Sequence, residues 1–153
     1  MGPVVALKDV ERQLAEMDGS PKTIEIVLVE DSPSDVRLFK EAIKRWRTPV
    51  RLTVADDGQK GIETLKAWTG RLPDLILINI NLPRVGGLDV LRWIRTRPKF
   101  NGIAAVVMSS SALDQDRANA LIRGAASYFL KGHNFDEYCA HVDEMYRKYF
   151  GAV

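Results

Sequence analysis

Apolar strand-like segments and amphipathic helices alternate along most of this chain. Short segments rich in apolar residues lie at residues 24–29, 50–54, 75–78, 103–108 and 127–130. The third of these is apolar at every position, which is typical of a strand buried on both faces at the centre of a parallel sheet. After each segment, apolar residues recur at three- and four-residue steps, which predicts an amphipathic helix. This alternation with short connections indicates an α/β fold with helices on both faces of a parallel sheet.

The helix boundaries carry recognisable start signals. Ser32 is placed to cap the first helix, and Asp35 completes a capping-box pattern with it. The fourth helix is expected to begin at one of the serines at 110–111. Its expected buried stripe consists of Ala118, Leu121 and Ile122.

Right-handed crossovers and one reversal of direction predict the strand order 2-1-3-4-5. We expect this domain to span residues 23–153, preceded by an N-terminal extension at 1–22. Apolar residues at helical spacing in the extension, from Leu7 to Met17, predict an additional amphipathic helix. Its partner is either the domain itself or a second copy of the chain.

Composition argues against several classes of protein. The net charge of +2 is too small to indicate nucleic-acid binding. The single cysteine, Cys139, allows no intramolecular disulfide and suits a reducing compartment. No apolar run has the length of a membrane span, and no signal-like segment begins the chain. We therefore expect a cytoplasmic protein that binds neither nucleic acid nor membranes.

Polar side chains end or follow four of the predicted strands, at one edge of the sheet. They are Glu30, Asp31, Asn79, Ser109 and Lys131. Two adjacent carboxylates with a further oxygen ligand suit a hard cation such as Mg²⁺. A hydroxyl and an ammonium beside the cation could hold the oxygens of a phosphoryl group. A nucleophile is missing from the set, because Asn79 carries a neutral amide where a carboxylate would be needed.

These strand-end motifs resemble the receiver domain of response regulators in two-component signalling. The acidic turn of that family is similar to residues 29–35, VEDSPSD. Its phospho-acceptor strand and loop are similar to residues 77–83, LININLP, together with Gly87. The resemblance runs from residue 24 to about residue 148. It implies the flavodoxin-like (βα)5 fold of the chemotaxis Y protein.

The resemblance also implies roles for individual residues. Ser109 falls on the family's Thr/Ser switch, Tyr128 on its switch aromatic and Lys131 on its lysine. The resemblance further implies a metal site made of Glu30, Asp31 and the backbone carbonyl of Asn81. The details VEDSP, NLPR and VMSSS look most like single-domain regulators that serve bacterial phytochrome histidine kinases. A sensor histidine kinase is therefore the expected partner, and enzymatic activity is not expected.

Three positions depart from the family pattern. Asn79 replaces the acceptor aspartate, Gly86 replaces an acidic loop residue, and Gly132 replaces the proline that commonly follows the lysine. The loss of one carboxylate predicts weak or absent Mg²⁺ binding and no aspartyl phosphate. Without metal we expect Lys131 to lean toward Asp31, and its removal to change the fold little. Asn79 is either a natural loss of the acceptor or an introduced substitution in a competent receiver.

The resemblance also implies pairing through the fourth helix, fifth strand and fifth helix. The last helix carries five rings, at Phe135, Tyr138, Tyr146, Tyr149 and Phe150. These are too many for one buried stripe, so we expect some to be exposed at a homodimer interface. A small flavin carrier or enzyme of flavodoxin-like fold is the alternative from another class. Its phosphate-binding loop would offer glycine and hydroxyl residues where this chain has acids.

Overall fold

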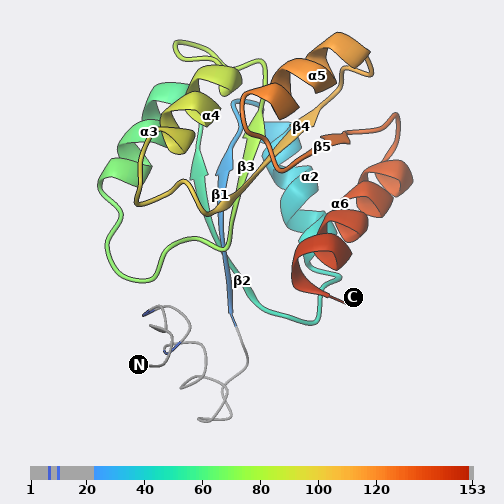
Figure 1. The fold of residues 1–153 in the computed structure, drawn as a ribbon. Coiled ribbons are helices and arrows are strands. Elements are labelled where there is room, and N and C mark those ends of the chain that lie inside the picture. Colours follow the sequence, from blue (N-terminus) through green and yellow to red (C-terminus); the bar gives the residue numbers. More distant parts are fainter. Residues whose placement is uncertain (1–6, 8–9, 11–22, 152–153) are drawn as a thin grey trace, which may run out of the picture.

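The computed structural model describes residues 23–151 together with Leu7 and Val10 (Figure 1). The strands are β1 (Ile24–Val29), β2 (Val50–Ala55), β3 (Leu75–Asn79), β4 (Ala104–Ser109) and β5 (Ser127–Leu130). The helices are α2 (Pro33–Ile43), α3 (Gly58–Lys66), α4 (Gly87–Arg95), α5 (Asp114–Ile122) and α6 (Phe135–Phe150). The helix predicted from Leu7 to Met17 lies outside the described residues, except for Leu7 and Val10, which are both exposed.

The five strands form one parallel sheet in the order β2-β1-β3-β4-β5, which confirms the predicted topology. The register aligns the carboxyl ends of the inner strands. Val29 pairs with Ile78, Asn79 with Met108, and Ser109 with Leu130. The polar residues that end or follow these strands therefore lie at one edge of the sheet.

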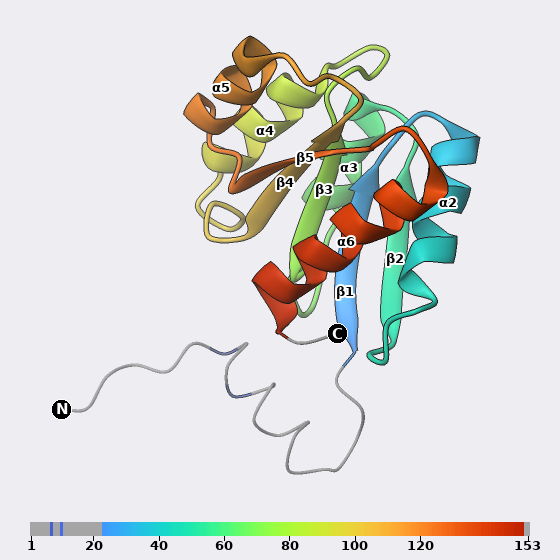
Figure 2. The same cartoon turned by 90° about the vertical axis from the view of Figure 1, so that its right-hand side faces the viewer.

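Helices cover both faces of the sheet (Figures 1 and 2). Helices α2 and α6 pack on one face, and α3, α4 and α5 lie on the other. Alternate residues of β3 enter the two cores: Leu75 and Leu77 face α2 and α6, whereas Ile76 and Ile78 face α3 and α4. All four are at most 1% exposed, as the unbroken apolar run predicts.

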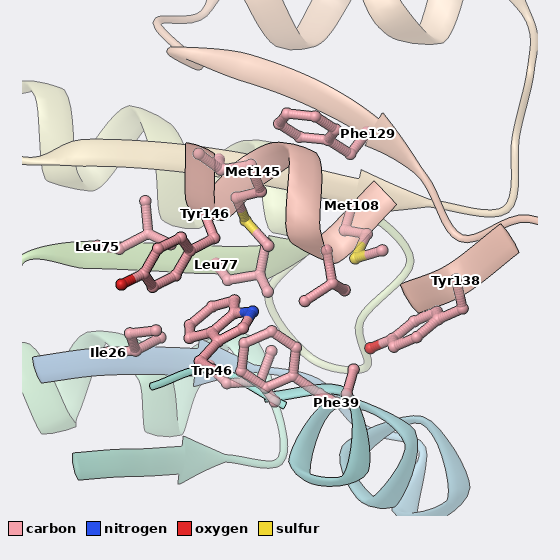
Figure 3. Close-up of a cluster of buried hydrophobic side chains, with 14 of the residues drawn as sticks. Ile26, Phe39, Trp46, Leu75, Leu77, Met108, Phe129, Tyr138, Met145 and Tyr146 are labelled. Atoms are coloured by element: carbon pink, nitrogen blue, oxygen red, sulfur yellow. The ribbon is translucent and has the colours of Figure 1, made fainter. Parts of the chain in front are cut away.

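Of the five rings of α6, one is exposed as predicted, two are buried and two are half-buried, so the expected cluster of exposed rings is not found. Trp46, which follows α2, lies between Phe39 and Tyr146, with ring centroids at 6.4 and 4.6 Å (Figure 3). Tyr138 is buried in the same cluster, and Tyr149 and Phe150 are half-buried against it. Phe135 alone among the rings of α6 is exposed. A distant tryptophan thus extends the buried face of α6, so these rings do not form an exposed aromatic patch.

Helix α5 is rotated relative to the prediction. Ala120 is its buried residue, while Leu121 is 44% and Ile122 is 83% exposed. Ala118 and Ile122 lie two positions from Ala120, about 200° around the helix axis, so they point away from the sheet. The small alanine side chain allows the helix to lie close to the sheet. The N-cap is Leu113 without a side-chain cap, and neither Ser110 nor Ser111 takes that position.

Candidate functional site

The carboxyl edge of the sheet brings together the residues that the sequence singled out. Glu30 and Asp31 directly follow β1, Asn79 ends β3, Ser109 ends β4, and Lys131 directly follows β5. Glu30 is 4% and Ser109 is 1% exposed, whereas Asp31 is exposed. The site is therefore a row of partly buried polar groups that opens to solvent beside Asp31.

The side-chain amide of Asn79 points toward the acidic turn. Its Nδ2 donates to Glu30 Oε2 at 2.9 Å, to Asp31 Oδ1 at 3.2 Å and to the backbone carbonyl of Asn81 at 3.3 Å. These three groups are those that the family resemblance assigns to a metal site. All three lie within hydrogen-bond distance of one atom, the amide nitrogen of Asn79.

Lys131 binds two carboxylates at this edge. Its Nζ lies 2.6 Å from Glu30 Oε1 and 2.6 Å from Asp35 Oδ2, and its side chain is only 13% exposed. The expectation that it leans toward Asp31 is wrong. Asp31 is exposed, whereas Asp35 is carried by the first turn of α2 to a place beside Glu30, where one ammonium can bind both carboxylates.

Asp35 is a site residue that the sequence reasoning missed. Its backbone N–H donates to Ser32 Oγ at 3.3 Å, which is one half of the predicted capping box. The other half is absent, because the carboxylate turns to Lys131 and the Ser32 N–H donates to Glu30 Oε2 at 3.4 Å. A carboxylate three residues after an N-cap serine predicts a capping box whether or not that carboxylate binds a lysine. The pattern alone therefore gave no signal for the contact between Asp35 and Lys131.

Burial and pairing set the acid–base state of the lysine and its partner. Burial raises the pKa of Glu30 above its ordinary value, and the nearby ammonium of Lys131 only partly opposes this effect. Burial alone would lower the pKa of Lys131, but hydrogen bonds and charges from Asp35 and Glu30 outweigh it and raise that pKa. Lys131 is therefore protonated at neutral pH and already has two carboxylate partners.

Ser109 and Tyr128 are connected through the backbone of Ser111. Ser109 Oγ accepts a hydrogen bond from the Ser111 N–H at 3.1 Å, and the Tyr128 hydroxyl donates to the Ser111 carbonyl at 2.7 Å. The Tyr128 ring is 7% exposed, and the Arg117 guanidinium lies 5.7 Å from its centroid. The Lys131 backbone N–H donates to the Ser109 carbonyl at 2.9 Å, but across the part of the chain that the structure describes no hydrogen bond joins the Ser109 side chain to Asn79 or Lys131. Ser109 and Tyr128 thus form a second cluster beside the acidic one.

Two glycines fix the loops around the site. A Cβ on Gly87 would lie 2.2 Å from the carbonyl oxygen of Asn79, so only glycine allows α4 to begin this close to the end of β3. Gly132, next to Lys131, has a φ of +83°. Proline is fixed near a φ of −65° and could not adopt this conformation. The glycine at this position therefore allows a backbone conformation that the family's proline would not.

The donors at this edge fit a hard divalent cation in kind. Glu30, Asp31 and the Asn81 carbonyl offer only oxygen, the element that Mg²⁺ prefers. Within residues 23–151, no group of three or more His, Cys, Asp or Glu side chains is arranged to hold a metal. A cation would therefore be held by two carboxylates and neutral oxygens, at the point where the Asn79 nitrogen now lies.

No helix among the described residues is long and apolar enough to cross a membrane.

Comparisons with known proteins agree with this fold. The response regulator Rcp1 of Synechocystis is 29% identical over 128 residues, which cover 81% of this chain and 86% of Rcp1. A crystal structure of the Mn²⁺-bound form of Rcp1 superposes with a TM-score of 0.76, at 28% identity, over 85% of this chain and 96% of that one. The phosphorylated cyanobacterial phytochrome response regulator RcpA gives a TM-score of 0.78 at 28% identity, over 84% of this chain and 94% of RcpA.

Some relatives are longer than this chain. The transcriptional regulatory protein TrcR of Mycobacterium tuberculosis is 32% identical over 131 residues, which are 86% of this chain but 48% of TrcR. The chain thus spans about half of that relative. The model of the response regulator receiver domain matches residues 26–143, from the middle of β1 into α6. The chain therefore belongs to the response regulator receiver domain family of two-component signalling, with phytochrome response regulators among its neighbours.

Proposed function

We propose that this receiver acts through protein–protein contacts without forming an aspartyl phosphate. The proposal rests on Asn79, which by resemblance corresponds to the family's phospho-acceptor. Its amide nitrogen donates to Glu30, Asp31 and the Asn81 carbonyl. The nitrogen lone pair is delocalised and the amide oxygen is neutral, so neither atom attacks phosphorus as a carboxylate does.

The proposed partner is a sensor histidine kinase, and a bacterial phytochrome is the first candidate. RcpA is described as a phytochrome response regulator, and it shares 28% of its sequence and the fold with this chain. We propose that Mg²⁺ binds at Glu30, Asp31 and the Asn81 carbonyl, but only weakly, because the amide of Asn79 replaces a full negative charge.

Phosphotransfer to paired variants tests the proposal. The protein, its Asn79→Asp variant and an Asn101→Asp control are incubated with Mg²⁺ and either acetyl phosphate or a phosphorylated histidine kinase. In the Asn79→Asp variant, a carboxylate oxygen attacks the phosphorus, and the bond from phosphorus to the donor breaks. We expect Mg²⁺-dependent, base-labile label on Asn79→Asp only. Asn101 is exposed and precedes the start of β4, whereas the site lies at the carboxyl ends of the strands, so its variant controls for the added charge.

The possible results separate the alternatives. Stoichiometric labelling of the unaltered protein would mean that another residue is the acceptor, and it would overturn the proposal. Label on Asn79→Asp alone supports it, and shows that the other groups of a competent receiver, including Ser109 and Lys131, are retained. If both proteins bind the kinase and neither is labelled, function through binding is supported, and the site has changed at more than one position.

We also propose a homodimer that forms without phosphorylation, through the face of α5, β5 and α6. Exposed apolar residues on α5 support this interface, whereas the aromatic rings of α6 do not. Leu113, Leu121 and Ile122 are all exposed on this short helix and the residue before it. Exposed apolar side chains that gather on one element favour an interface.

A further inference from the structure

The amide nitrogen of Asn79 has an unusual set of neighbours for a neutral group. Its acceptors are two carboxylates and one carbonyl, at 2.9, 3.2 and 3.3 Å. They come from two segments distant in the sequence, the turn after β1 and the loop after β3. An amide has two N–H bonds, so three acceptors share two hydrogens. This arrangement resembles the shell of oxygens around a small cation more than an ordinary pair of hydrogen bonds.

The orientation of the amide follows from these acceptors. With the amide turned by 180°, its oxygen would face Glu30, Asp31 and the Asn81 carbonyl, and four oxygens would meet without a hydrogen between them. Oxygen atoms bearing negative charge repel at such distances unless a cation or a donor lies between them. The nitrogen therefore faces the acidic turn as long as no cation does.

Two of the three carboxylates at the site share one lysine. Lys131 binds Glu30 Oε1, which leaves Glu30 Oε2 for Asn79, and the second partner of Lys131 is Asp35. The network thus runs from Asp35 through Lys131, Glu30 and Asn79 to Asp31. It connects α2, β5, β1 and β3 through side chains of the protein alone.

We propose that the Asn79 amide takes the structural place of the divalent cation in this receiver, and that a metal binds only by displacing the amide from its three oxygens. This inference rests on the proposed function, in which Asn79 stands at the acceptor position. It goes beyond the loss of charge, because it assigns an active, competing role to the amide. The three oxygens are then held together by the amide without Mg²⁺ and by the cation when Mg²⁺ binds.

Weak Mg²⁺ binding could come from the missing negative charge alone or from competition by the amide, and the two causes predict different Mg²⁺ affinities for Asn79→Ala. If weak binding came only from the missing charge, alanine would not restore that charge and would also remove a potential oxygen ligand. Its Mg²⁺ affinity would then equal or fall below that of the unaltered protein. If the amide competes with the metal, alanine removes the competitor. Affinity should then rise about tenfold, the equivalent of one net hydrogen bond to a charged group.

Metal titrations of the full chain test this difference. Mg²⁺ binding is measured by calorimetry, and free Mn²⁺ by electron paramagnetic resonance, for the unaltered protein, Asn79→Ala, Asn79→Asp and an Asn101→Ala control. We expect the affinity order Asn79→Asp, then Asn79→Ala, then the unaltered protein and the control together. An Asn79→Ala affinity no higher than that of the unaltered protein overturns the proposal.

A second measurement uses only the unaltered protein, so it holds even if Asn79→Ala folds poorly. In metal-free buffer, the two side-chain amide protons of Asn79 should exchange more slowly with water than those of the exposed Asn101, by about tenfold or more for one net hydrogen bond to charged groups. Saturating Mg²⁺ should remove this protection. Equal exchange of the two side chains without metal, or protection that Mg²⁺ leaves unchanged, contradicts the displacement of the amide. Neither measurement involves phosphoryl transfer, so the proposed function can fail while this inference holds, and the reverse.

Discussion

Lys131 has a structural role in addition to the role that the family resemblance implies. Its ammonium is 13% exposed and binds both Glu30 and Asp35 at 2.6 Å. The sequence indicated a lysine at this edge, and the resemblance implied a role toward a phosphoryl group. The structure adds that, without such a group, the lysine neutralises a carboxylate that is 4% exposed. Its removal should therefore cost stability, in contrast to the expectation from the sequence.

We predict that Lys131→Ala lowers the free energy of unfolding by about 2–3 kcal/mol, since it leaves a buried carboxylate unpaired. Urea denaturation at neutral pH measures this loss. The control is Lys40→Ala, on an exposed position of α2, which should shift the midpoint little. Adding Glu30→Gln to Lys131→Ala should recover part of the loss, because the unpaired charge is removed. Equal midpoints for the Lys131 and Lys40 variants would contradict the structural role.

Tyr138 gives a prediction about alkaline pH. Its side chain is buried, and burial, helped by the charges of Asp35 and Glu30, raises its pKa well above the ordinary value. Below about pH 10 the phenol is neutral in the folded and unfolded chains, so it adds no pH dependence. Above that pH only the unfolded chain ionises, which favours unfolding. Unfolding midpoints of the unaltered protein should therefore fall faster between pH 9 and pH 11 than those of Tyr138→Phe. Parallel curves would mean that the phenol ionises equally in both states.

At the scale of elements, the start of α4 depends on a close backbone approach. A Cβ on Gly87 would meet the Asn79 carbonyl oxygen at 2.2 Å and the Ile80 Cα at 2.8 Å, and both are backbone atoms that cannot rotate away. We predict that Gly87→Ala destabilises the protein by about 2 kcal/mol or more and disturbs the Asn79 side chain. The control is Gly102→Ala, where the added Cβ would meet nothing within 4 Å. Thermal unfolding of both variants measures the difference. Similar melting temperatures would show that the loop can shift at little cost.

The accuracy of the sequence predictions differed between elements for physical reasons. The central strand β3 is apolar on both faces, so its residues from Leu75 to Ile78 predict its burial without knowledge of any neighbour. Helix α5 has a weak pattern, and its orientation depends on how closely Ala120 can approach the sheet. The burial of Tyr146 depends on Trp46, about 100 residues earlier in the chain. Contacts of this kind are made in tertiary packing and leave no periodic signal in the sequence.

At the scale of the whole molecule, the fold brings separate strand ends to one site. The alternation of strands and helices predicted the sheet order, and the sheet order placed Glu30, Asn79, Ser109 and Lys131 at one edge. The partners within that edge were less predictable. The hydrogen bonds of Asn79 depend on the path of the loop to Asn81, and the contact of Lys131 with Asp35 depends on the first turn of α2. Register thus determined which residues meet, and loop geometry determined how they bind.

The last prediction concerns association through the face of α5, β5 and α6. Ile122 is 83% exposed, so Ile122→Asp should leave the monomer's stability nearly unchanged. In a dimer that buries this side chain, the same substitution removes an apolar contact and adds a charge. Burial of an isoleucine contributes about 1.5–3 kcal/mol, so the dissociation constant should rise about tenfold to a hundredfold. Sedimentation of the unaltered protein and of Ile122→Asp over a micromolar concentration range measures this change. Phe135→Ser is the control, because Phe135 is exposed beside Arg45, on the side of α6 toward α2. A monomer at every concentration would exclude the dimer, and equal weakening by both substitutions would contradict an interface confined to the face of α5, β5 and α6.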